Sequence, residues 1–160
     1  MFVDRPVINE SVKRGKIKFV FGKAVIIVYR HSPCLLNVTG LKSSKEIRQL
    51  WKDLESRFKL HCFKIRIDNI FYSHKDKKVY NLFHLFYFLK GFCPEAYSVD
   101  YNVEIFPGMF LKSKSKTLPT LILFTTGSYS IIGAKSFDSA WRAKIFVNKL
   151  FSIASVLNYD

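Results

Sequence analysis

Lysines alternate with serines along the segment Lys112-Ser-Lys-Ser-Lys116. Alternate side chains of a β-strand point to the same face, so this spacing predicts a row of ammonium groups. Such a row binds phosphate oxygens through its charge, although a solvated hairpin would show the same pattern. The whole chain carries 26 Lys and Arg against 12 Asp and Glu, a net charge of +14. This charge predicts a polyanionic partner, either a nucleic acid or an anionic membrane surface.

Residue types that support catalysis or metal binding do not occur at useful spacings. The four histidines have no cysteine or acid at ligand spacing, and the three cysteines form no C-x-x-C motif. The sequence has no G-x-S-x-G motif and no complete phosphate-binding loop. We therefore expect a protein that is not an enzyme and that binds no metal, cofactor or small-molecule substrate. The histidines are His31, His61, His74 and His84.

Length and hydropathy argue against a membrane span. The longest apolar stretches, residues 19–28 and 79–92, are shorter than the roughly 20 residues that cross a bilayer. The N-terminal residues lack the basic segment and apolar core of a signal peptide. The 160 residues suit one domain or two small lobes. We expect a soluble, intracellular chain with reduced cysteines.

Two periodicities alternate along the chain and predict the elements that position these side chains. Runs of β-branched and aromatic residues predict strands at 16–21, 24–29, 34–39, 61–72, 101–106, 109–112, 120–124 and 129–132. Apolar residues at helical spacing predict helices at 44–58, 80–92 and 137–157. Ser43, with Glu46 three positions later, predicts a capping box at the start of the first helix.

A short motif, Gly-x-Lys-Ser, occurs twice, at Gly40 and at Gly133. Each copy ends a run of predicted strands and begins a predicted helix. It is similar to the end of a phosphate-binding loop, but the upstream glycine is missing, and a capping serine explains it without a nucleotide. Two copies in the same context indicate an internal duplication of a strands-then-helix unit.

Three segments in the second half closely resemble the second repeat of TATA-box-binding proteins. They are residues 104–112, 119–127 and 131–136. In the family they read E-L-F-P-G-L-I-Y-R, an apolar strand that ends in Phe before S-G, and T-G-A-K. Residues 63–70 resemble the strand that opens this repeat, and the first half keeps the resemblance in residues 24–29 and 38–43. The resemblance implies a shortened, degenerate first repeat over residues 1–60 and a second repeat over 61–160.

The family resemblance implies an α+β saddle. Two pseudo-symmetric lobes would share one curved antiparallel sheet, with helices on its convex face. The concave face would bind the minor groove of A·T-rich promoter DNA, because that groove offers acceptors at A·T pairs and is obstructed by the guanine amino group. Aromatic side chains would separate base steps and bend the DNA. The implied function is a transcription initiation factor that bends DNA and recruits transcription machinery.

Specific residues match the DNA-contacting positions of the family. Phe106 and Phe124 match the second lobe's wedge pair, and Asn69 matches its base-contacting Asn. Lys112 stands where the family has a phosphate-contacting Arg, and Lys135 matches the Lys of T-G-A-K. The remaining positions expected on the DNA-facing surface are Phe71, Ile122, Ile132, Tyr29, Thr39 and Lys42.

The sequence departs from the family at several of these positions. Tyr29 replaces a wedge Phe, Ile132 replaces a Thr, and Phe71 replaces a small Val. Residues 12–15, where the first lobe's outer wedge is expected, contain no aromatic residue. We therefore expect stronger kinking at the Phe106 and Phe124 end. A divergent member from a large DNA virus or a fast-evolving eukaryote fits this pattern, which implies the nucleus or a cytoplasmic viral factory.

Two other functions would use the same surface. A single-stranded nucleic-acid binder would stack bases on the aromatic side chains. An interaction module with this fold would have lost DNA binding, so its DNA affinity would not depend on Phe106 or Phe124. Membrane binding needs a basic amphipathic helix, which neither long helix provides. Protein partners are expected on the exposed face of residues 44–58 and near Asp100 and Glu104.

Overall fold

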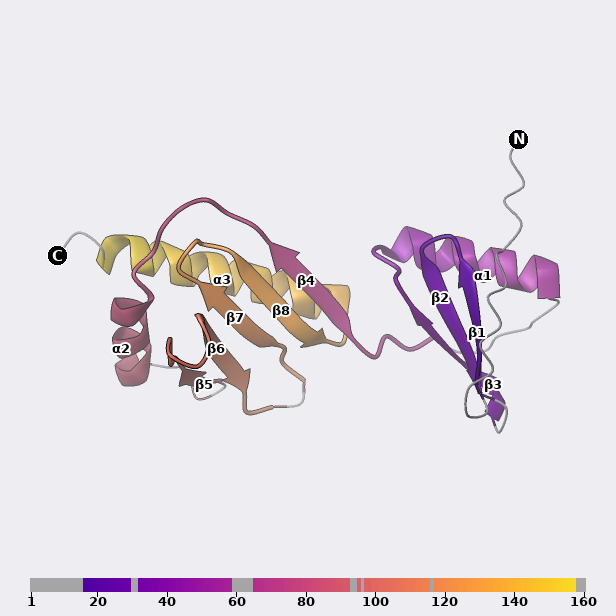
Figure 1. Ribbon diagram of the computed structural model, residues 1–160, viewed down its shortest axis with the longest axis horizontal. Helices are drawn as coiled ribbons and strands as arrows, with labels where there is room; N and C mark the ends of the chain where they lie inside the picture. The colour runs from indigo at the N-terminus through magenta and orange to yellow at the C-terminus, as the bar shows by residue number, and fades with distance from the viewer. Residues whose placement is uncertain are drawn as a thin grey trace. The chain divides into compact units, whose positions relative to one another are not determined.

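The computed structural model describes residues 16–29, 32–58, 65–92, 95, 97–115 and 117–157. Packing divides the chain into two compact units, Met1–Lys64 and Ile65–Asp160 (Figure 1). This division lies close to the expected boundary between residues 60 and 61. That the two units are repeats of one another stays a prediction.

The first unit contains a three-stranded antiparallel sheet and one helix. Its elements are β1 (Lys16–Phe21), β2 (Ala24–Tyr29), β3 (Ser32–Thr39) and α1 (Ser44–Phe58), and the strand order is β1-β2-β3. Along β2, Ala24 and Ile26 are buried against Leu50 and Leu54 of α1. Because successive side chains of a strand alternate between faces, Tyr29 lies on the face away from α1.

The second unit contains a five-stranded antiparallel sheet and two helices (Figure 1). Its strand order is β4-β8-β7-β6-β5. The elements are β4 (Ile70–His74), α2 (Leu82–Phe92), β5 (Tyr97–Asp100), β6 (Gly108–Ser113), β7 (Thr120–Phe124), β8 (Tyr129–Ala134) and α3 (Phe137–Leu157). Helices and antiparallel sheets in both units confirm the expected α+β class.

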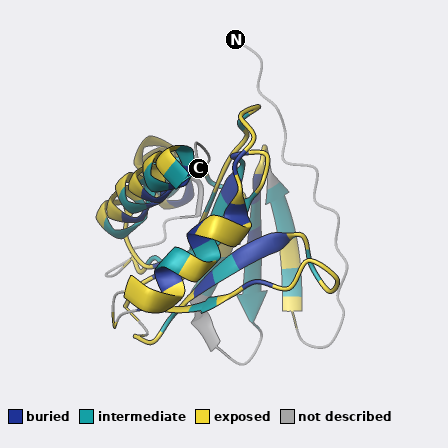
Figure 2. Ribbon diagram, turned by 90° about the vertical axis from the view of Figure 1, so that its left-hand side faces the viewer, coloured by how far each residue is buried: buried dark blue, intermediate teal, exposed yellow. Residues whose placement is uncertain are grey.

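The core of the second unit lies between one face of its sheet and the two helices. Apolar side chains at alternate positions of the central strands are fully buried there: Met109, Leu111, Leu121, Leu123 and Ile131. Leu85 of α2 and Val147 of α3 pack against them. Figure 2 shows buried and exposed residues alternating along the helices, as expected for elements that bury one side. The side chains between these buried positions point to the opposite face of the sheet.

Both Gly-x-Lys-Ser motifs adopt the same local conformation. Gly40 has a φ of 89° and Gly133 a φ of 87°, a left-handed region that favours glycine. In each case the serine three residues later caps the helix that follows. The Oγ of Ser43 accepts a hydrogen bond from the N–H of Glu46 at 3.2 Å, which confirms Ser43 as the N-cap. The Glu46 carboxylate accepts from the N–H of Lys42 at 2.6 Å and not from Ser43, so the second bond of the predicted capping box is displaced by one residue. The Oγ of Ser136 accepts one at 3.1 Å from the N–H of Ser139.

Two predicted strands were placed wrongly. Residues 101–106, where a strand is expected, contain no strand. The strand β5 ends just before them, at Asp100, and a turn follows. In that turn Asn102 accepts backbone hydrogen bonds that a strand ladder would otherwise use. Its Oδ1 accepts from the N–H of Glu104 at 3.1 Å, and its backbone carbonyl accepts from the N–H of Phe106 at 2.9 Å. The strand expected at 61–72 begins only at Ile70. Residues 65–69 are described but are not part of a strand, and 61–64 lie outside the described residues.

Among the described residues, no helix combines the length and the apolar character that crossing a bilayer requires.

Candidate nucleic-acid interface

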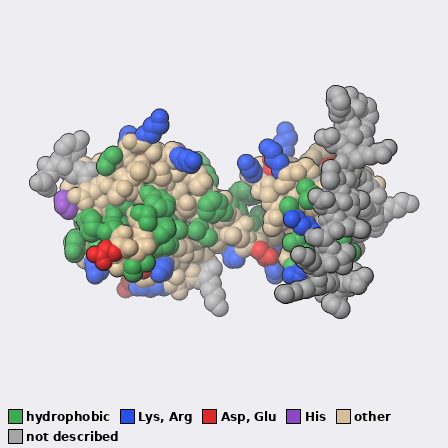
Figure 3. All heavy atoms as spheres, viewed as in Figure 1, with side chains coloured by type: hydrophobic (Ala, Val, Ile, Leu, Met, Phe, Trp, Pro, Cys, Tyr) green, Lys and Arg blue, Asp and Glu red, His purple; other side chains and the backbone are tan. Residues whose placement is uncertain are grey.

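The face of the second sheet that is turned away from α3 carries a group of apolar side chains. We call it the open face and define it by Phe71, Phe110, Lys112, Ile122, Phe124 and Ile132. On β6, β7 and β8 these residues alternate with buried core positions, so their side chains point to the other side of the sheet. On β4, Phe71 precedes Tyr72, which packs against the core, and so Phe71 points to the same side as the others. Figure 3 shows hydrophobic side chains gathered over this unit, with Lys and Arg around them. Five of the expected site residues thus share one surface: Phe71, Lys112, Ile122, Phe124 and Ile132.

Phe106 and Phe124 lie together at one end of the open face. Their ring centroids are 5.9 Å apart, and Phe110 lies 5.0 Å from Phe106 on its other side. All three rings are partly exposed and none belongs to the buried core. Neither Phe106 nor Phe124 is therefore sealed inside the fold, as a role in contacting DNA requires.

Gly108 provides the space in which these rings pack. It pairs with Phe124 across β6 and β7. A Cβ atom added to Gly108 would lie 2.6 Å from Cε1 of Phe106, 2.8 Å from Cγ2 of Ile122 and 3.0 Å from Cε1 of Phe124. Because real Cβ contacts are longer, any side chain here would displace the rings. The missing side chain of Gly108 therefore sets the position of the cluster.

Asn69 is oriented by the backbone of β8. Its Oδ1 accepts a hydrogen bond of 2.9 Å from the N–H of Gly133. A backbone N–H can bond only to the amide oxygen of Asn69. The Nδ2 group of this exposed side chain therefore remains a donor for another molecule. A fixed donor suits the acceptors that A·T pairs present in the minor groove.

Lys112 is the cation of the open face, and an acid lies beside it. Its Nζ is 3.2 Å from Oδ2 of Asp100 and 5.4 Å from the ring centroid of Phe110. The side chains of Lys112 and Asp100 are 56% and 60% exposed, so water screens the pair and the attraction is weak. Lys112 can therefore exchange this carboxylate for a phosphate oxygen at small cost.

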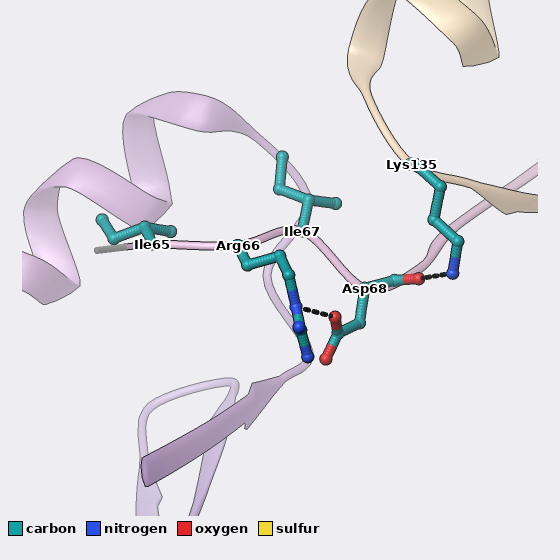
Figure 4. A pocket seen from close by; sticks show the side chains of 5 residues that line it. All are labelled: Ile65, Arg66, Ile67, Asp68 and Lys135. Atoms are coloured by element: carbon teal, nitrogen blue, oxygen red, sulfur yellow. Dashed lines mark hydrogen bonds and ion pairs between the residues drawn. The ribbon is translucent and has the colours of Figure 1, made fainter. Parts of the chain in front are cut away.

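Lys135 is bound within its own unit. Its Nζ donates to the backbone carbonyl of Asp68, and the side chain of Asp68 pairs with Nε of Arg66 at 2.6 Å. Together with Ile65 and Ile67 these residues line a shallow hollow in which Arg66 and Lys135 approach Asp68 from two sides (Figure 4). Lys135 thus ties the segment before β4 to the turn before α3.

Two of the three expected residues of the first unit, Tyr29 and Thr39, lie on the face of the sheet away from α1, and Lys42 lies between β3 and α1. The hydroxyl of Tyr29 accepts a hydrogen bond of 2.9 Å from Nδ2 of Asn37, and Nζ of Lys16 lies 5.1 Å from the centroid of its ring. Thr39 is exposed at the end of β3, where it pairs with Val25 on β2. Lys42 has an exposed side chain, and its backbone N–H donates to the Glu46 carboxylate at 2.6 Å.

Sequence reasoning missed several residues on these surfaces. Phe110 was treated as part of a strand, although its position two residues before Lys112 indicates that the two share a face. Asp100 is expected near a protein-docking surface and not beside Lys112, and Gly108 has no expected role in the site. In the first unit, Lys16 pairs with Tyr29 and Lys18 with Ile27, so both lysines lie on the face away from α1. Strand register, which the sequence does not contain, was needed to find them.

Within the described part of the chain, no group of three or more His, Cys, Asp or Glu residues could hold a metal ion.

No family model matches the sequence, and no curated protein matches it. Among solved structures, the TATA-box-binding protein (TBP) of Methanococcus jannaschii is similar over 86% of this chain and 78% of that chain, with 21% identity and a TM-score of 0.63. The chain has the TBP fold. This confirms the fold that the sequence motifs implied. A viral origin, and a single sheet shared by both units of the TBP fold, stay predictions.

Proposed function

We propose that this chain binds the minor groove of A·T-rich duplex DNA, bends it and recruits transcription machinery, without enzymatic activity. One observation carries the proposal: Phe124, Ile122 and Ile132 of the open face, and Phe106 at its end, lie outside the core of their unit. An apolar surface without helical cover needs a ligand that tolerates few hydrogen bonds. The floor of the minor groove at A·T pairs is such a ligand.

The chemistry of the surface supports a duplex groove in three ways. Phe106 and Phe124 are flat, apolar and adjacent, which suits insertion between base pairs. Asn69 keeps a donor for base acceptors while its oxygen is held by Gly133. Lys112 and the net charge of +14 supply phosphate contacts and long-range attraction.

Promoter DNA and transcription proteins would be the partners of such a factor. RNA polymerase-associated proteins or transcription factors would dock away from the open face, for example on the exposed side of α1 or near Glu104. The site of action would be the nucleus, or a cytoplasmic viral factory if the chain is viral. Neither a membrane nor a small-molecule substrate is part of this proposal.

Energy transfer between dyes at the two ends of a duplex tests the bending. Bending brings the ends together, so we expect energy transfer to rise on an A·T-rich duplex and to stay low on a G·C duplex of equal length. Replacing both wedge residues, Phe106→Ala with Phe124→Ala, should abolish the rise. Phe92→Ala is the matched control, because Phe92 is a highly exposed phenylalanine on α2 and not on the open face.

The same variants decide whether the chain binds DNA by this surface at all. Equal affinity for A·T-rich and G·C duplexes, with no bending of either, would contradict the proposal. If the parent binds DNA only weakly and the double variant binds it equally, the open face does not bind DNA, as expected for an interaction module with the TBP fold.

A second candidate function is binding of single-stranded nucleic acid. Phe71 is 61% exposed and Phe110 is partly exposed, so the open face presents two more flat rings than a wedge pair requires. Exposed aromatic side chains on a sheet stack unpaired bases in many single-strand binders. Competition between an A·T-rich duplex and a single strand of the same length separates the two functions, and preference for the single strand would favour this one.

A further inference from the structure

The aromatic side chains of the two units are held in different ways. In the second unit the ring of Phe106 lies beside two other rings, Phe110 at 5.0 Å and Phe124 at 5.9 Å. Phenyl rings have no polar atom, so no hydrogen bond opposes their insertion between bases. The space above Gly108 lets the rings pack without touching a backbone Cβ. Insertion of Phe106 and Phe124 between bases would therefore break no side-chain hydrogen bond.

Tyr29, which the family resemblance places at the wedge position of the first unit, is restrained at its hydroxyl and over one face of its ring. Its hydroxyl accepts from Nδ2 of Asn37 at 2.9 Å, and the ammonium group of Lys16 lies 5.1 Å from the ring centroid. Insertion between bases would break the hydrogen bond and leave the hydroxyl without a partner. It would also separate the ring from the cation. Among the described side chains on that face of the first unit, Tyr29 is the one aromatic residue.

We propose that this chain unstacks bases only at the steps contacted by the second unit, and that the first unit holds the DNA without inserting a side chain. This inference rests on the proposed function and specifies how its two units differ. The first unit holds DNA by charge: Lys16 and Lys18 are exposed at alternate positions of β1, on the same face as Tyr29. Alternate lysines along a strand can contact phosphates of one DNA strand.

The position of unstacking can be measured with 2-aminopurine, a fluorescent base that brightens when it loses its stacking neighbours. A series of otherwise identical A·T-rich duplexes carries one 2-aminopurine at each successive step of the bound site. We expect one block of steps to brighten on binding. Phe106→Ala with Phe124→Ala should remove the signal, and Tyr29→Ala should leave it unchanged. Thermal unfolding of each variant shows whether it remains folded.

The lysines give a second, independent measurement. Lys16→Gln with Lys18→Gln should weaken binding several-fold at low salt and reduce the slope of log affinity against log salt concentration. The position and brightness of the 2-aminopurine signal should not change in the bound complex. Both effects follow if the first unit contributes charge rather than insertion.

Two separate blocks of bright steps, one of which is lost in Tyr29→Ala, would overturn the inference while leaving the proposed bending intact. A single block that depends on Tyr29 and not on Phe106 would overturn it as well. If no step brightens although the duplex is bound, insertion fails in both units, and with it the bending mechanism of the proposed function. The three failures are therefore distinguishable.

Discussion

The ammonium group of Lys112 lies 3.2 Å from the Asp100 carboxylate on the neighbouring strand of the open face. An acid at this position lowers the positive potential of a surface that we propose to meet phosphates. Because Lys112 also lies over the Phe110 ring, the pair connects the edge strand β5 to the aromatic cluster. Asp100 therefore limits how strongly this surface attracts a polyanion.

Replacing Asp100 by Asn should strengthen DNA binding. The substitution frees Lys112 for phosphate and removes a repelling charge, and an exposed pair of this kind is worth about 0.5 kcal/mol, or about twofold to threefold in affinity. Titration of a labelled A·T-rich duplex at low and high salt measures the effect, which should shrink as salt screens the charges. Asp138→Asn removes an equal charge from the Arg142 pair on α3 and should change affinity less. An equal gain in both variants would mean that only net charge matters.

Replacing Gly108 by Ala should disturb bending more than folding. The new Cβ would meet atoms of Phe106, Ile122 and Phe124 at 3.0 Å or less, so the partly exposed rings must move outward. Repacking toward solvent should cost less than about 1 kcal/mol, below the range for a closed core, whereas the wedge geometry is altered. We expect a thermal midpoint within about 4 °C of the parent and a clear loss of end-to-end energy transfer.

The matched control for this substitution is Gly91→Ala on α2. A Cβ at Gly91 meets no heavy atom within 4 Å. Alanine is the better helix former, so this variant should be as stable as the parent or slightly more stable, with unchanged bending. Unchanged bending in Gly108→Ala would show that the exact ring positions are not important.

Replacing Asn69 by Asp keeps the acceptor that orients the side chain and removes the amide donor proposed to contact DNA bases. The carboxylate can still accept the Gly133 N–H, so the turn before α3 should persist. The amide donor is lost and a negative charge is added, which together should weaken DNA binding by about tenfold, or about 1.4 kcal/mol. Asn148→Asp, the same change at an exposed site of α3, controls for net charge. Similar losses in both variants would argue against a role of Asn69 in contacting bases.

Alkaline pH should destabilise the second unit through Tyr129. Burial raises the pKa of the Tyr129 phenol above its usual range, and the adjacent Tyr72 raises it further by charge and by a hydrogen bond. In the unfolded chain this phenol ionises near its ordinary pKa of about 10. Above that pH the unfolded state loses a proton that the folded state retains, so the free energy of unfolding falls as pH rises.

Urea unfolding at several pH values between neutral and strongly alkaline measures this effect. Tyr129→Phe should show a shallower decline, after an initial loss of about 1 kcal/mol at neutral pH from the missing hydrogen bond. Tyr87→Phe is the control, because Tyr87 is 68% exposed and should not change the slope. An identical decline in the parent and in Tyr129→Phe would exclude Tyr129 as the cause.

Much of the fold follows from local patterns in the sequence. The helix α3 begins and ends where its apolar spacing predicts, and α1 begins after its capping serine. The strands at 16–21, 24–29 and 120–124 agree as well. These elements are determined by side-chain periodicity and by capping residues a few positions away. Local information was therefore sufficient for them.

The errors occurred where a distant or competing hydrogen bond decides the structure. Asn102 closes a turn within a segment that has strand composition, and Asn69 bonds to Gly133, which lies far along the chain. For the candidate site, the motifs identified Phe106 and Phe124 but not the third ring, Phe110, nor Asp100 beside Lys112. Those neighbours depend on the register between β5, β6 and β7. Register is a property of the folded sheet and has no local signature.

The two left-handed turns at Gly40 and Gly133 show how few residues one feature of the fold depends on. Each turn contains a glycine with a positive φ, and a serine three positions later caps the helix that follows. A chain can therefore have the TBP fold at 21% identity to a solved TBP, because a few glycine and serine positions fix these turns. Searches for other chains of this fold should score such turn geometry rather than overall residue identity.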